Sequence, residues 1–245
     1  AVLRRELATP GYSTSPLVIG AATDCYQPAE RDLRPTRALI EVLSESRQPF
    51  SVITKYRPVE RDLDLIAPRA ARGLSAVYGP ITSLDAALAR QMEPRAATPA
   101  RRLRTLRTLA AAGVPTGVSV APQIPFINND MEQVLQAARD AGAERAFYTV
   151  LRLPWEVAPL FQEWLAAHFP DRAARVMARV RDMRGGRDYQ AQFGRRMQGE
   201  GVWADLLAQR FAAACTRLGL NGERRGVLDC SQFRPPALNG QQSLF

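Results

Sequence analysis

The chain has 245 residues, of which 46% are hydrophobic and 23% charged, a composition typical of a folded globular protein and unlike that of a disordered one. Its net charge of +9 is compatible with nucleic-acid binding, but every basic residue except Lys55 is an arginine, a bias that indicates a GC-rich genome more than a binding surface. No apolar run approaches the roughly 18 residues that span a bilayer, so we expect a cytoplasmic protein with no membrane partner.

The first 155 residues alternate short β-like runs with helical runs. Strands are expected to begin at Leu17, Phe50, Ser75, Thr116 and Ala146, and helices are expected over residues 35–46, 62–71, 84–91, 98–112 and 129–142. Thr98 and Pro99 suit the start of the fourth helix, and Asn129 with Asp130 suits the cap of the fifth. The alternation predicts an α/β fold with a parallel sheet, in an open or partial barrel whose chemistry lies where the strands end.

After Pro154 the pattern becomes helical. Helices are expected over residues 156–168, 171–183 and 202–218, followed by one further strand over 226–230 and a flexible tail that begins at Pro235. We therefore expect two parts: a partial barrel over residues 1–155, and a helical C-terminal extension with its tail over residues 156–245.

Polar residues follow several of the expected strands. Asp24 can accept hydrogen bonds from a ligand ammonium or hydroxyl, or form a turn. Lys55 ends an apolar strand, where an isolated charge is costly, so a ligand carboxylate or phosphate is its natural partner unless the side chain reaches solvent. Thr82 and Ser83 can contact a ligand or cap the next helix.

Three more segments follow in the chain. Glu93 and Arg95 read most simply as a structural ion pair, and the two prolines of residues 121–130 predict a stiff loop at the barrel mouth. Arg152 can bind an anion or a neighbouring carboxylate.

The cysteines do not predict a metal site. Cys25, Cys215, Cys230 and the single His168 lack any C-x-x-C spacing, so a site would need long-range convergence. Cys215 reads as a small apolar residue on a helix face beside Phe211 and Leu218.

A set of short motifs runs through the chain in a fixed order. They are Gly20-x-x-Thr23-Asp24-x-Tyr26-Gln27-Pro28-x-Glu30, Val52-Ile53-Thr54-Lys55, Ile81-Thr82-Ser83-Leu84-Asp85, Glu93-Pro94-Arg95, Leu151-Arg152-Leu153-Pro154 and Met183-Arg184-Gly185-Gly186. Each motif is weak alone, but their order and spacing together resemble those of radical S-adenosylmethionine (SAM) proteins of the spore photoproduct lyase-like, or DNA repair photolyase-like, group. The resemblance covers nearly the whole chain.

The resemblance implies a partial (β/α) barrel of radical SAM type that holds SAM and a [4Fe-4S] cluster. In the family, a C-x3-C-x2-C loop after the first strand ligates the cluster, and this sequence contains no such loop. Its first clear strand corresponds to the family's second, so we expect the first strand and the cluster loop to lie upstream of Ala1. The chain then reads as a fragment, or as the product of a truncated gene, with the cluster present only in a longer form.

The resemblance also implies roles for individual residues. Lys55 resembles the lysine that meets the SAM carboxylate, and Thr23 and Asp24 occupy the place that holds its amino group. The other expected contacts are Thr82 and Ser83 near the ribose or carboxylate, Ala121, Pro122 and Ile124 beside adenine, and Tyr26, Tyr148 and Arg152 near the substrate.

Two functions remain open at this point. In the first, the intact protein is a radical SAM lyase that receives an electron from a reductant protein, cleaves SAM and abstracts hydrogen from a substrate, by analogy a nucleic-acid base. In the second, the chain is a cluster-less, non-catalytic module that binds nucleic acid or a protein partner through its arginine-rich helices.

Overall fold

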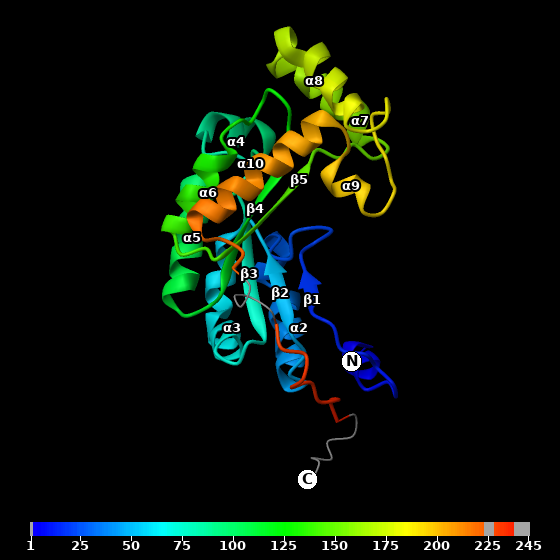
Figure 1. The fold of residues 1–245 in the computed structure, drawn as a ribbon. Helices are drawn as coiled ribbons and strands as arrows, with labels where there is room; N and C mark the ends of the chain where they lie inside the picture. The colour runs from blue at the N-terminus through cyan, green and yellow to red at the C-terminus, as the bar shows by residue number, and fades with distance from the viewer. Residues whose placement is uncertain (1, 223–227, 238–245) are drawn as a thin grey trace.

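The computed structural model describes residues 2–222 and 228–237. Its centre is a parallel sheet whose five strands follow one another in chain order: β1 (Leu17–Ile19), β2 (Phe50–Ile53), β3 (Ser75–Pro80), β4 (Thr116–Gln123) and β5 (Arg145–Val150). Each strand pairs with the next. Figure 1 shows that the sheet curves into a half-barrel. The α/β class and the parallel partial barrel predicted from the sequence are confirmed.

Helices connect the strands. Their bounds are α1 (Val2–Leu7), α2 (Pro35–Glu45), α3 (Leu63–Ala70), α4 (Ala86–Met92), α5 (Pro99–Ala111), α6 (Met131–Asp140), α7 (Val157–His168), α8 (Pro170–Asp182), α9 (Arg195–Gln198) and α10 (Val202–Leu218), with short 3-10 helices η1 (Pro28–Arg31) and η2 (Arg57–Asp62). Several of them, among them α3, α5 and α6, cover the outer face of the sheet. The sequence did not predict α9, η1 or η2, because segments this short carry too few periodic residues to stand out.

Two helix starts show what local sequence can and cannot predict. Thr98 caps α5 as expected, since its hydroxyl accepts a hydrogen bond from the backbone of Arg101. Asp130 occupies the N-cap position of α6, as expected, but its side chain makes no capping hydrogen bond. Its carboxylate instead accepts hydrogen bonds from the Ser83 hydroxyl (2.9 Å) and from the backbone N–H of Leu84 (2.7 Å), which ties α6 to the end of β3.

The hydrophobic core lies between the sheet and its outer helices. One cluster joins Val118 of β4 to Val134 of α6 and to Cys215 of α10, so α10 returns to the barrel and runs alongside α6 (Figure 1). Cys215 is therefore a buried apolar residue that packs near Phe211 and Leu218, as predicted, and burial raises the pKa of its thiol to about 11.

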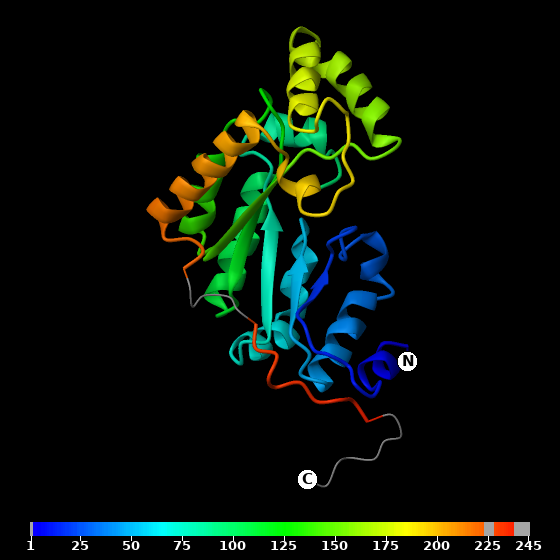
Figure 2. The same ribbon diagram turned by 45° about the vertical axis from the view of Figure 1, so that its right-hand side comes forward.

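The helices that follow β5 build a second layer above the strand ends. Leu165 of α7 and Val176 of α8 pack with Ile124 and Leu153 from the ends of β4 and β5. Figure 2 shows α7 and α8 (yellow-green) at one end of the molecule, beyond the sheet. The division at residue 155 stays a prediction, and α10 shares a core with the barrel.

Only part of the predicted C-terminal strand and tail lies within the described residues. Residues 228–230 form no strand, and residues 226 and 227 lie outside the described residues, as does most of the expected tail. Within residues 2–222 and 228–237, no helix is both long enough and apolar enough to cross a membrane.

Candidate functional site

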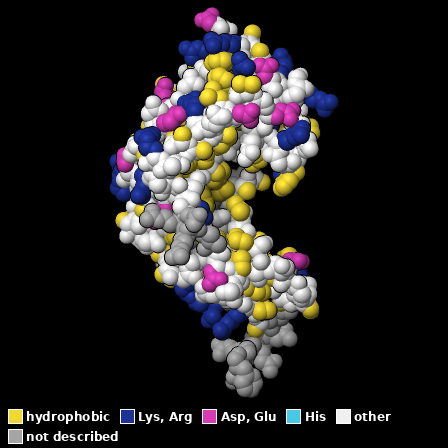
Figure 3. Space-filling view, viewed as in Figure 1, with side chains coloured by type: hydrophobic (Ala, Val, Ile, Leu, Met, Phe, Trp, Pro, Cys, Tyr) yellow, Lys and Arg dark blue, Asp and Glu magenta, His cyan; other side chains and the backbone are white. Residues whose placement is uncertain are grey.

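A pocket of about 620 Å³ lies at the carboxyl ends of all five strands. This volume is in the range of small-molecule sites, and strand ends are where parallel α/β folds place their ligands. Figure 3 shows the molecule hollowed on this side, with hydrophobic side chains inside the hollow. Of the residues predicted from the sequence, the pocket is lined by Thr23, Asp24, Lys55, Ala121, Pro122 and Arg152.

Gly20 brings the first loop of the pocket against β2. Its φ is +90°, and a Cβ added there would lie 2.2 Å from the carbonyl oxygen of Ile53. No other residue type fits this approach without moving the backbone. The loop of residues 20–24 therefore crosses the end of β2 and forms one wall of the pocket.

Asp24 fastens this loop to the end of β2. Its Oδ1 accepts hydrogen bonds from the backbone N–H of Tyr26 (2.9 Å) and the hydroxyl of Thr54 (2.8 Å), and its Oδ2 accepts one from the backbone N–H of Lys55 (2.8 Å). The structure thus shows the turn-forming role of Asp24, and its contact with a ligand stays a prediction.

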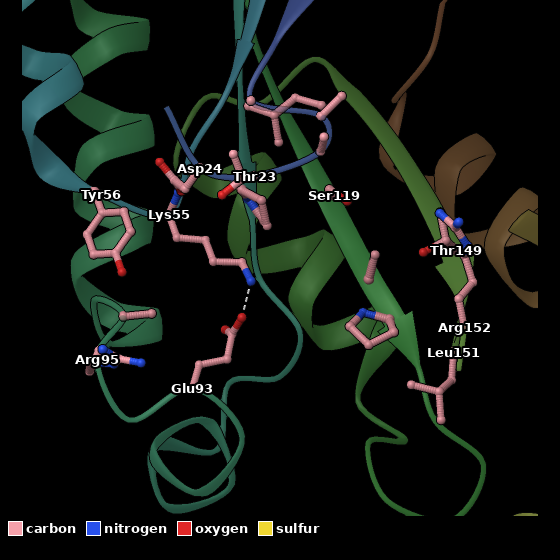
Figure 4. Close-up of a pocket in the computed structure, with 18 of the residues that line it drawn as sticks. Thr23, Asp24, Lys55, Tyr56, Glu93, Arg95, Ser119, Thr149, Leu151 and Arg152 are labelled. Carbon is pink, nitrogen blue, oxygen red and sulfur yellow. Dashed lines mark hydrogen bonds and ion pairs between the residues drawn. The ribbon is translucent and has the colours of Figure 1, made fainter. Parts of the chain in front are cut away.

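Lys55 projects from the end of β2 into the pocket and meets a carboxylate of the protein itself. Its Nζ donates to Glu93, the contact drawn as a dashed line in Figure 4. The second oxygen of Glu93 accepts from Nη2 of Arg102 at 2.7 Å. Arg102 is 4% exposed and also donates to the carbonyl oxygens of Ala97 and Pro80.

The predicted ion pair between Glu93 and Arg95 is wrong. Arg95 is exposed at the pocket rim, and Glu93 instead joins Lys55 to the buried Arg102. Burial alone would raise the pKa of Glu93, but the attraction of Arg102 and Lys55 outweighs it, so the pKa is lowered and the carboxylate is ionised at neutral pH. Sequence reasoning missed Arg102 because it occupies the buried face of an arginine-rich helix, where nothing distinguishes it from its exposed neighbours.

Three residues predicted to touch SAM lie outside the pocket lining. The hydroxyl of Thr82 donates to the carbonyl oxygen of Ala121 (2.9 Å), and that of Ser83 donates to Asp130. Both are buried and join the end of β3 to the neighbouring loops, while Ile124 packs in the core beneath α7. Their side chains therefore support the pocket from behind.

The two tyrosines predicted near the substrate also face away from this pocket. The hydroxyl of Tyr26, which is 2% exposed, donates to Asp62 (2.9 Å), and the ring of Tyr148 packs on Phe211 with centroids 4.8 Å apart. Burial is the main cause that raises the pKa of both hydroxyls. Hydrophobic clusters hold both rings in place, and the hydrogen bond to Asp62 also holds Tyr26.

The described residues do not fit a [4Fe-4S] cluster. No group of three or more His, Cys, Asp or Glu side chains within them is placed to hold a metal. Cys25 is half-buried near the first loop, where burial and the nearby Asp24 raise the pKa of its thiol to about 12 and disfavour the thiolate that would bind iron.

Comparisons with known proteins place the chain among uncharacterized relatives. No family model matches it. An uncharacterized protein of Mycobacterium tuberculosis is 33% identical over 178 residues, which is 71% of this chain and 52% of that protein. An uncharacterized protein of Methanocaldococcus jannaschii is 23% identical over 155 residues, covering 63% of this chain and 57% of the relative. The chain thus spans about half the length of the curated relatives it matches.

A solved structure shares the fold. It is spore photoproduct lyase in complex with dinucleoside spore photoproduct, with a TM-score of 0.55 and 14% identity over 89% of this chain and 63% of the lyase chain. At this identity the likeness shows the fold alone, a partial (β/α) barrel.

Proposed function

We propose that this chain forms the SAM- and substrate-binding part of a radical SAM enzyme. The observation that carries the proposal is the position of Lys55, the only lysine, inside a ligand-sized pocket at the strand ends of a radical SAM-type half-barrel. Arginine serves everywhere else as the basic residue, so a compact ammonium at this position suits a specific ligand.

Lys55 retains the capacity to bind a carboxylate. The Lys55 ammonium has three N–H donors. Within the described residues Glu93 is its one hydrogen-bond acceptor, so donors remain for a ligand. Since Arg102 also pairs with Glu93, the carboxylate is shared between two cations and leaves net positive charge at this wall. The carboxylate of SAM is the ligand group that we assign to it.

The remaining contacts come from the adjacent loops. The carboxylate of Asp24 accepts three hydrogen bonds, which leaves acceptor capacity for the SAM ammonium. Thr23 is exposed beside it, and its hydroxyl proton can turn towards a ligand because its oxygen already accepts from Gln27 (2.7 Å). Ala121 and Pro122 give a flat, mainly apolar surface for adenine.

Bound SAM would supply the means to abstract a hydrogen atom from the substrate, provided that a reduced cluster cleaves it. The described residues do not fit that cluster, so we derive no step through it. What the chain's own residues do is orient SAM through Lys55 and Asp24 and shield its adenine end from water. The lyase of similar fold carries a dinucleoside ligand, so a nucleic-acid base is the first substrate to test.

Titration of the purified chain with SAM tests the proposal. We expect saturable binding that is about 10- to 100-fold weaker in Lys55→Met, which corresponds to a charge-assisted hydrogen bond of about 1.5–3 kcal/mol. Lys55→Arg should also bind more weakly, because a planar guanidinium does not occupy the same compact place. Arg107→Gln, an exposed residue of α5, is the control for net charge. Equal affinities in the wild type and Lys55→Met, or no binding to the wild type, would exclude the assigned site.

A further inference from the structure

The wall of the pocket across from Lys55 carries an arginine without a carboxylate partner among the described residues. Arg152 follows β5 and lines the pocket. Its Nη1 contacts the sulfur of Met197 at 3.6 Å, and its Nε is buried with no hydrogen-bond partner. Figure 4 places Arg152 and Thr149 together on this wall, opposite Lys55 and Glu93.

A second, deeper arginine stands behind it. Arg184 is 1% exposed and donates hydrogen bonds to the carbonyl oxygens of Leu151 (2.7 Å) and Arg195 (3.2 Å). The charge of Glu200 attracts Arg184 without a hydrogen bond, because the Glu200 carboxylate is paired with Arg195 at 3.0 Å. Burial, and after it the charge of Arg152, lowers the pKa of Arg184, so the two cations repel each other. Within residues 2–222 and 228–237, neither is paired with a carboxylate.

Two other arginines near the barrel mouth have acidic partners. Arg102 pairs with Glu93, and Arg61 pairs with Glu30 and Asp62 at 2.8 Å. Arg152 is only partly buried, but Arg184 behind it is 1% exposed, and a buried cation without an acidic partner is unfavourable unless a ligand anion offsets its charge. The β5 wall is thus the place in the described pocket where an external anion gains most.

We propose that Arg152, backed by Arg184, forms an anion subsite that binds a phosphate or carboxylate group of the second substrate. The proposal deepens the function proposed above, because it takes the first ligand of the pocket to be SAM and assigns an acidic group to the other. The hydroxyl of Thr149, on the same wall, is a further donor to the anion. Arg184 is a positioning residue: it holds the carbonyl oxygen of Leu151 and thereby the backbone that carries Arg152.

The test uses anions alone, at constant ionic strength. Inorganic phosphate is followed by its ³¹P line width and acetate by its ¹H line width, in titrations with the full chain. We expect saturable broadening with at least one of them, and an apparent Kd about tenfold higher in Arg152→Gln, as the loss of a charge-assisted pair predicts. Arg107→Gln carries the same change in net charge on an exposed helix and should bind like the wild type.

The outcomes separate the two proposals. Binding of phosphate alone indicates a phosphorylated substrate, and binding of acetate at least as tight indicates a carboxylic acid. Lys55→Met should keep this anion binding, and Arg152→Gln should keep SAM binding, so either proposal can fail while the other stands. No saturable binding of either anion, equal binding in Arg152→Gln, or an equal loss in Arg107→Gln would overturn the anion subsite.

Discussion

Replacing Glu93 by Gln should destabilise the protein more than removing Lys55, its partner in the pocket. Gln keeps the size of Glu, but it leaves Arg102, which is 4% exposed, without a counter-charge. Removing one partner of a buried ion pair costs about 3–5 kcal/mol. In a chain of this length each kcal/mol lowers the melting temperature by about 2–4 °C, so we expect a fall of about 6–20 °C at pH 7.

Lys55→Met is the matched comparison. It keeps most of the aliphatic stem and leaves Glu93 paired with Arg102, and the lysine is about one-third exposed, so its loss should cost less than about 1 kcal/mol. Thermal unfolding of the wild type and both variants measures the difference directly. A melting temperature of Glu93→Gln within about 2 °C of the wild type, or an equal fall in Lys55→Met, would refute this account of the network.

The pH dependence adds a second readout. The pKa of Glu93 is lowered in the folded protein from its ordinary value of 4.5, so the unfolded chain binds more protons as the solution is acidified. The stabilisation by Glu93 is therefore complete above that value and is lost as the pH falls through the lower folded-state pKa. The difference in stability between the wild type and Glu93→Gln should shrink over the same range, which denaturant unfolding at a series of pH values will show.

Three further predictions follow from other parts of the molecule. Asp62 is fully buried and accepts hydrogen bonds from Tyr26, Arg37 and Arg61. Asp62→Asn should therefore lower the free energy of unfolding, measured in urea at pH 7, by about 3–5 kcal/mol. A loss under about 1 kcal/mol would show that the cluster tolerates removal of the charge. Gly20→Ala should destabilise the chain and weaken SAM binding together, because the added Cβ overlaps the backbone of Ile53. Gly186→Ala is the control for backbone strain alone, since Gly186 has a similar positive φ but a Cβ added there meets no neighbouring atom within 4 Å. Any nucleic-acid binding should weaken steeply between low and physiological salt in a gel-shift series, since the charge of +9 is its main source; affinity that persists at high salt with a clear sequence preference would contradict this.

The order of the strands and the main helices could be read from the sequence because they depend on local patterns. Alternating apolar runs such as the one starting at Phe50 predict a strand wherever they occur, and Thr98 followed by Pro99 predicts a helix start without reference to the rest of the chain. The position of Lys55 at a strand end placed it at the barrel mouth for the same reason, since all parallel strands end on one edge.

Only the tertiary structure decided which side chains meet there. Glu93 was expected to pair with Arg95, two residues away, but it pairs with Lys55 and Arg102, because the fold brings the end of β2 and the buried face of α5 to the same point. Tyr26 lies in the core and not in the large pocket because its hydroxyl meets Asp62, which is 36 residues distant. Arg184 lies behind the pocket because the segment that follows α8 returns to the end of β5, where Met183 packs with Val150 and Arg184 donates to the carbonyl oxygen of Leu151. Periodicity encodes which face of an element is buried, whereas partners that are distant in sequence are set by how the elements pack.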